Sequence, residues 1–170
     1  MGAMPEFRRD VLVSVRPTYA GKILTGQKTV ELRRRFPESG LVGATVLIYS
    51  SSPVCAIIAS ARIRHVLKLP LSKIWKQHGV AACISRVEFD SYFAGLKLGF
   101  AILFEDLRPL ANQLSATELA EQFGIVPPQS YRYVTRECIA FVSDDRFQTS
   151  NRYKRGHRVG RPAARSIVSR

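Results

Sequence analysis

The chain has 170 residues, 46% of them hydrophobic and 23% charged, which fits one globular domain and excludes a wholly disordered chain. No apolar run approaches the roughly 18 residues of a membrane-spanning helix, so no membrane partner is expected. Lys and Arg (26) outnumber Asp and Glu (13) and give a formal net charge of +13, which favours a polyanionic partner, above all nucleic acid, over a merely solubilising surface.

Six strands are predicted from short apolar and β-branched runs bounded by Gly, Pro or Ser. They do not alternate regularly with helices, which argues against a doubly wound parallel sheet. A compact, mainly antiparallel barrel or sheet with helices around it fits the order better. The expected strands cover residues 11–16, 28–33, 44–50, 54–69, 97–107 and 134–142.

Short helices are expected between these strands. Pro17 begins the first helix, because proline is tolerated in a first helical turn. Ser85 with Glu88, and Ser115 with Glu118, have the spacing of a capping box, which marks two further helix starts. The helices predicted in this way cover residues 17–24, 71–79, 85–95 and 115–124.

The composition changes near Asp144, where apolar periodicity ends and Gly, Pro, Ser and Arg become frequent. We therefore expect an N-terminal extension (1–10), one domain (11–143) and a basic tail (144–170) that is disordered when free. Such a tail either serves solubility alone or follows a phosphate backbone and adds salt-sensitive affinity with little sequence choice. Its candidate phosphate contacts are Arg152, Lys154, Arg155 and Arg158.

The three cysteines and three histidines are scattered, without metal-ligand spacing. No metal site, disulfide framework or cofactor is therefore expected. Unpaired cysteines also favour a reducing compartment, so the expected location is cytoplasmic.

Charged residues gather in "GQKTVELRRR", around the second predicted strand. Side chains alternate along a strand, so Val30 and Leu32 share a face suited to the core, while Glu31 and Arg33 share the other. Lys28, at the start of this strand, is free to turn toward either face. From the spacing alone, the charged face is either a solvated ion pair on an edge strand or one wall of a ligand cleft.

The pattern Gly26-x-Lys28-x-x-Glu31-x-Arg33, after a strand and a short helix, resembles the GxKxxExR signature of the ASCH family. The segments "SVRPTYAGKILTG", "FDSYFAG" and "PPQSYRYV" agree with the long form of that family and extend the resemblance over residues 11–142. The resemblance implies an α+β, PUA-like fold: a small, mainly antiparallel β-barrel with flanking short helices. It also implies a cleft lined by the three charged signature residues, and RNA or modified bases as ligands, with RNA preferred over DNA.

Further cleft residues are expected, since a base needs flat apolar surface with oriented polar groups and a phosphate needs cations. Arg34 extends the basic rim. Loops that contain Pro53 and Pro127 place serine hydroxyls and an amide near the cleft. The polar candidates are Ser51, Ser52, Gln129 and Ser130; the stacking candidates, each otherwise a core aromatic, are Tyr131, Tyr133, Tyr92 and Trp75.

Three functions are compatible with these observations. The first is a module that binds RNA or a modified nucleobase. The second is a metal-independent hydrolase, a ribonuclease or an amidohydrolase on a modified nucleoside, with Lys28 and Glu31 as catalytic candidates and Glu88 more distant. The amidohydrolases of the family carry Thr three residues after the Lys, where this chain has Glu31. The third is a transcription-linked regulatory module, although no helix-turn-helix is evident.

Geometry separates the first two functions. A catalytic cleft should bring Lys28 and a carboxylate within hydrogen-bond reach around a small closed pocket. A binding site should open as a groove flanked by Arg33, Arg34 and the Ser51 loop.

Overall fold

A computed structural model describes residues 9–144 of the chain. Its strands form one six-stranded sheet in the order β2-β5-β4-β3-β1-β6. β1 and β3 pair in parallel, and the other neighbours pair antiparallel. The strands are β1 (Val11–Val15), β2 (Val30–Arg33), β3 (Thr45–Ser50), β4 (Ala56–Pro70), β5 (Leu98–Ser115) and β6 (Tyr131–Tyr133).

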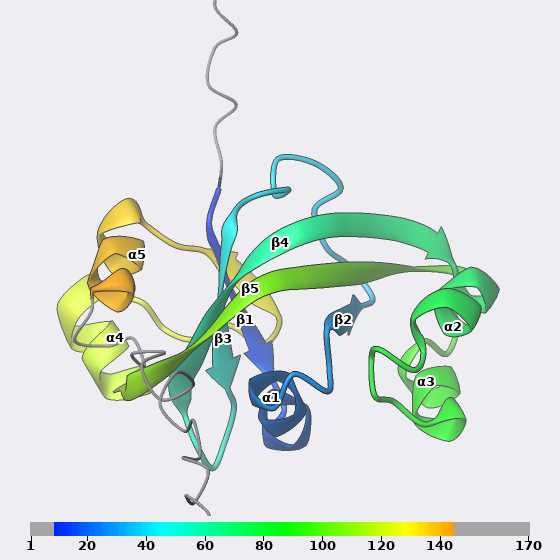
Figure 1. The fold of residues 1–170 in the computed structure, drawn as a ribbon, viewed down its shortest axis with the longest axis horizontal. Helices are drawn as coiled ribbons and strands as arrows, with labels where there is room; N and C mark the ends of the chain where they lie inside the picture. The colour runs from blue at the N-terminus through cyan, green and yellow to red at the C-terminus, as the bar shows by residue number, and fades with distance from the viewer. Residues whose placement is uncertain (1–8, 145–170) are drawn as a thin grey trace, which may run out of the picture.

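Short helices flank this sheet. Figure 1 shows α4 and α5 at one end of the molecule and α2 and α3 at the other, with α1 below the sheet. The helices are α1 (Pro17–Leu24), α2 (Leu71–His78), α3 (Arg86–Tyr92), α4 (Ala116–Phe123) and α5 (Arg136–Ser143). Within residues 9–144, none of them is long and apolar enough to cross a membrane.

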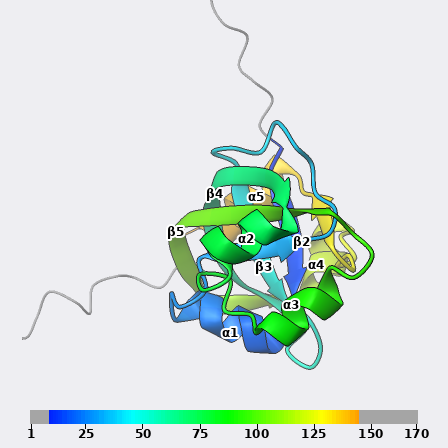
Figure 2. The ribbon, with the colours of Figure 1, turned by 90° about the vertical axis from the view of Figure 1, so that its right-hand side faces the viewer.

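The long strands β4 and β5 run together as a curved ribbon across the molecule (Figure 1). Their pairing shifts register at three places, between Ile57 and Ala59, Ser60 and Arg62, and Ile63 and His65. Irregularities of this kind bend a strand and increase its twist. The mixed sheet therefore curls into a half-barrel, and Figure 2 shows it curled behind α2 and α3.

Three hydrophobic clusters hold the helices on the half-barrel. The first fills its interior, around Val13, Ile48 and Ile102. The second, with Leu12 and Leu119, packs α4 and α5 against the opposite face of β1 and β3. The third joins β2 and β5 to α2 and α3, and its residues include Val30, Leu32, Ile74, Phe89 and Phe93.

The expected α+β fold, a small and mainly antiparallel barrel-like sheet with short helices, is confirmed. The capping boxes also hold, since the hydroxyls of Ser85 and Ser115 accept hydrogen bonds from the backbone N–H of Glu88 and Glu118.

Two predicted strands need correction. The segment 134–142 is not a strand: β6 precedes it, and α5 occupies most of it. The Thr135 side chain caps this helix at the Cys138 N–H, and Cys138 and Val142, four residues apart, are both buried. The strand predicted over 97–107 continues to Ser115, because the pairing with β4 resumes after a register shift instead of ending there.

Candidate functional site

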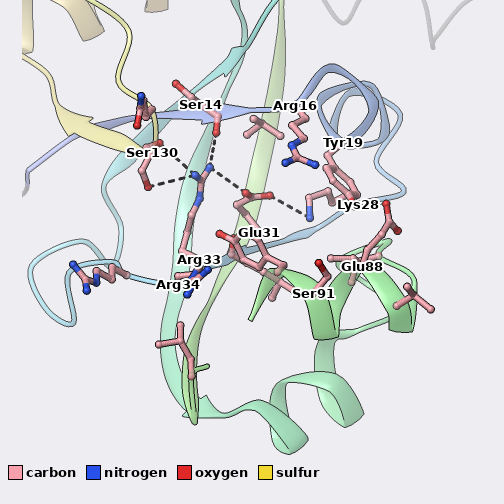
Figure 3. A pocket seen from close by; sticks show the side chains of 18 residues that line it. Ser14, Arg16, Tyr19, Lys28, Glu31, Arg33, Arg34, Glu88, Ser91 and Ser130 are labelled. Carbon is pink, nitrogen blue, oxygen red and sulfur yellow. Dashed lines mark hydrogen bonds and ion pairs between the residues drawn. The ribbon is translucent and has the colours of Figure 1, made fainter. Parts of the chain in front are cut away.

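A pocket of about 870 Å³ opens between the ends of β1 and β2, the start of α1, and α3. Four separate parts of the chain line it, and Figure 3 shows their side chains turned toward one another. Its apolar lining is Val15, Leu32, Ile84, Val87 and Leu96, and its polar lining includes Ser14, Arg16, Tyr19, Lys28, Glu31, Arg33, Arg34, Arg35, Glu88, Ser91, Tyr92, Gln129 and Ser130.

Lys28, Glu31 and Arg33 form a buried ion-pair network in this pocket (Figure 3). The Glu31 carboxylate lies 3.2 Å from Lys28 Nζ through one oxygen and 3.0 Å from an Arg33 guanidinium nitrogen through the other. The three residues are only 4%, 8% and 6% exposed, in sequence order. The interpretation as a solvated ion pair is therefore wrong, although β2 does lie at the edge of the sheet.

The Lys28 ammonium connects β2 to the segment before α3. Its Nζ donates hydrogen bonds of 2.8 Å to the carbonyl oxygens of Val30 and Ala82, in addition to its ion pair with Glu31. An ammonium has three N–H donors, so these contacts use all of them. A direct hydrogen bond from Lys28 to a ligand would require one of these contacts to break.

Arg33 connects β2 to the other side of the pocket. Its guanidinium donates a 2.7 Å hydrogen bond to the Ser14 carbonyl and a longer one, 3.4 Å, to the Ser130 carbonyl. The Ser14 hydroxyl in turn donates to the carbonyl oxygen of Pro128. Arg33 and Ser14 together therefore hold Pro128 and Ser130 against the end of β1.

Tyr19 and Glu88 face each other across the pocket from α1 and α3. The Tyr19 hydroxyl donates a 3.2 Å hydrogen bond to Glu88. Partial burial, and then the adjacent Glu88 carboxylate, raise the pKa of Tyr19. Hydrogen bonds from the Ser85 hydroxyl and then its N–H lower the pKa of Glu88, because they favour the charged carboxylate. Glu88 is therefore ionised at neutral pH and held mainly by the cap of α3.

Three arginines, Arg16, Arg34 and Arg35, line the pocket with exposed side chains, and we call them the rim arginines. Arg34 donates one 3.3 Å hydrogen bond to the Ala94 carbonyl. Within residues 9–144, the side chains of Arg16 and Arg35 make no hydrogen bond or ion pair with another residue. The rim therefore presents cations that are largely free to meet a ligand.

The structure brings some of the predicted residues together. Arg34, Gln129 and Ser130 line the same pocket as the three signature residues, and so does the stacking candidate Tyr92. Burial raises the pKa of Tyr92, whose hydroxyl donates to the Leu32 carbonyl at 3.4 Å.

Other predicted residues lie outside the pocket lining. Ser51 and Ser52 belong to a turn before the cis peptide bond of Pro53. Tyr131 packs edge-on against Phe36, with ring centroids 4.9 Å apart. The remaining two stacking candidates pack elsewhere, Tyr133 near Tyr131 and Trp75 against Phe89. The tail candidates Arg152, Lys154, Arg155 and Arg158 lie outside the described residues.

Sequence reasoning missed Arg16, Tyr19 and Ser14. A signal was available for Arg16, since it lies between the last residue of β1 and Pro17, where a strand end meets a helix start. Such junctions commonly line ligand sites on a rigid scaffold.

Comparison with known proteins assigns the family. No family model matches the chain. An ASCH domain-containing ribonuclease from Zymomonas mobilis is 30% identical over 131 residues, which cover 76% of this chain and 87% of that protein. The crystal structure of ASCH from the same organism has a TM-score of 0.75 at 28% identity, covering 84% of this chain and 97% of that one.

A serine-to-alanine variant of the Zymomonas protein matches with a TM-score of 0.74 at 28% identity, over 80% of this chain and 95% of that one. The N-terminal domain of McrB from Staphylothermus marinus, at 10% identity and a TM-score of 0.53 over 82% and 96% of the two chains, shares the fold alone. The half-barrel with its charged pocket is thus an ASCH-type structure. The chain belongs to the ASCH domain family, and the resemblance seen in its signature is confirmed.

Proposed function

We propose that this protein binds RNA and that the pocket above the ion-pair network is where it does so. The observation that carries the proposal is the combination of a concave site of about 870 Å³ with rim arginines around a buried, internally paired floor. A volume of this size lies within the roughly 300–1,000 Å³ typical of ligand sites. The formal net charge of +13 favours the same class of partner.

The two kinds of lining match the two parts of a nucleotide. Ile84, Val87 and Leu96 offer apolar surface for a base, with Tyr92 beside them. Arginines bind phosphate through several N–H donors at once. Preference for RNA over DNA, and a cytoplasmic location supported by the free thiols of the cysteines, belong to the same proposal.

Fluorescence anisotropy with labelled single-stranded RNA, tRNA and a DNA of matching sequence tests this proposal. The informative variant is Val87→Glu, because Val87 lines the pocket and is 79% exposed, so the change adds negative charge without disturbing the core. Val80→Glu is the matched control: Val80 is 94% exposed and lies outside the pocket lining. We expect Val87→Glu to weaken RNA binding well beyond Val80→Glu. Equal effects of the two variants would place binding elsewhere.

Cleavage of RNA is a second candidate function, favoured by one specific observation. Lys28 lies 3.2 Å from the Glu31 carboxylate within the pocket, which is the contact expected of a catalytic cleft, although the pocket of about 870 Å³ is not the small closed one expected with it. The Ser51 loop does not flank the pocket, as it was expected to flank an open groove. The relative from Zymomonas mobilis that is named a ribonuclease supports the same candidate.

A gel assay on the same RNA, with EDTA present, tests cleavage and its independence of metal ions. Val87→Glu and Val80→Glu, purified in parallel with the wild type, separate the pocket from a contaminating nuclease. Cleavage that falls with Val87→Glu and persists with Val80→Glu supports the ribonuclease. Cleavage that is equal in all three preparations contradicts it.

A further inference from the structure

The cations of the pocket fall into two sets that differ in what already holds them. Lys28 and Arg33 are buried and paired with Glu31, and they also donate to backbone carbonyls on both sides of β2. The rim arginines are exposed. Within residues 9–144, the first set has one unpaired donor left, the buried Nε of Arg33, because its other donors already have partners. The second set has most of its N–H donors available to a ligand.

The free-energy cost of binding a phosphate therefore differs between the two sets of cations. A phosphate that reached Lys28 or Arg33 would displace existing hydrogen bonds, and the Glu31 carboxylate beside them offsets part of their positive charge. Within residues 9–144, a phosphate at the rim would break no hydrogen bond or ion pair of Arg16 and one 3.3 Å hydrogen bond of Arg34. Arginine presents five N–H donors in a planar fork, which suits bidentate contact with phosphate oxygens.

The positions of two rim arginines suit a shared ligand. Arg16 occupies the N-cap position of α1, in an extended conformation that leads directly out of β1. Arg34 follows the last residue of β2. Figure 3 shows these two side chains on opposite sides of the ion-pair network, with the paired side chains between them. The sugar-phosphate backbone of an RNA that crosses the pocket mouth would contact both arginines.

We propose that Arg16 and Arg34 form the phosphate subsite of the pocket, while Lys28 and Arg33 mainly hold the pocket wall. This inference rests on the proposed RNA binding and adds which residues contact the RNA phosphates. It gives the electrostatic contact to residues outside the GxKxxExR signature.

The salt dependence of RNA binding tests the subsite directly. For single strands, the slope of log affinity against log salt changes by about 0.7 for each phosphate contact. Arg16→Gln and Arg34→Gln should each flatten the slope by about that amount, and the double variant by about 1.4. Arg64→Gln, which changes an exposed arginine of β4 outside the pocket lining, should leave the slope unchanged.

A second arm keeps the subsite separate from RNA binding itself. Titration of the full chain with a nucleoside 5′-monophosphate and with the matching nucleoside, followed by calorimetry, measures the contribution of one phosphate. The wild type should prefer the monophosphate, and the double variant should lose that preference.

The outcomes of the two arms are distinct. If the wild type binds no RNA, the proposed function fails, and the monophosphate arm still decides the subsite. If Val87→Glu weakens RNA binding while the double variant keeps the wild-type slope and monophosphate preference, the pocket binds RNA and the subsite is overturned.

Discussion

Glu31→Gln should destabilise the protein strongly, because this carboxylate is shared by two buried cations. Each cation lies about 3 Å from it, at 3.2 Å for Lys28 and 3.0 Å for Arg33. At an effective dielectric constant of about 20, each contact is worth roughly 5 kcal/mol before the cost of desolvation. Glutamine removes both attractions and leaves two buried positive charges unpaired. Loss of one partner from a buried pair costs about 3–5 kcal/mol, and we expect that loss in the free energy of unfolding.

Urea unfolding at pH 7, followed by far-UV circular dichroism, measures this loss. With a slope of about 2 kcal/mol per molar urea, the midpoint should fall by about 1.5–2.5 M. Glu38→Gln is the matched control, because it makes the same substitution in the pair of Glu38 with Lys68, whose side chains are 62% and 41% exposed. An exposed pair contributes about 0–1 kcal/mol. If Glu31→Gln costs no more than Glu38→Gln, the network does not hold the site together and the reasoning is refuted.

Four further predictions concern the rest of the fold. Ser115→Ala should lower the free energy of unfolding by about 1 kcal/mol through loss of a helix cap. Hydrogen bonds from the Ser115 hydroxyl and then its N–H lower the pKa of Glu118 in the folded protein. The ionised Glu118 therefore stabilises the fold fully above its unfolded-state pKa, and this stabilisation is lost as the pH falls through its folded-state pKa. Glu118→Gln should therefore flatten the acid limb of the plot of unfolding free energy against pH, between about pH 5 and 3. Ile102→Ala, in the half-barrel interior, should cost about 2–5 kcal/mol in urea unfolding. Burial raises the pKa of Cys138 to about 11, so iodoacetamide at pH 8 should label the half-buried Cys83 well before Cys138, as read by mass spectrometry.

The parts of this fold that local chemistry determines were predictable from the sequence. Pro17 and the two capping boxes mark helix starts within a few residues, and the alternation along β2 assigns Val30 and Leu32 to the core. The error over 134–142 arose where a short apolar run suits both strand and helix. There the Thr135 cap and the packing of α5 decide the outcome, and the packing depends on distant residues.

The site was predictable only in part, because its closure is nonlocal. Arg33 donates to Ser130, which is 97 positions away, and Lys28 donates to Ala82, 54 positions away. Such contacts follow from how β1, β2 and the loops converge, and no local pattern reports them. Arg16 enters the site through the same convergence, and the local sign of it is its position between the end of β1 and Pro17.

The signature residues Lys28, Glu31 and Arg33 connect several segments of the chain, and these connections bear on the ligand specificity of the pocket. The pocket walls come from β1 with the start of α1, from β2, from the α3 region and from the loop of residues 127–130, which are separate segments. Apolar contacts alone allow two segments to slide past one another, whereas hydrogen bonds of defined direction fix the distance between the segments. Lys28 and Arg33, joined through Glu31, provide such bonds to both sides of β2. If the signature mainly sets the shape of the pocket, then ligand choice falls to its neighbours, Arg16 and Arg34 at the rim and the apolar wall. Two chains with the same GxKxxExR pattern would then share the pocket and differ in what they bind.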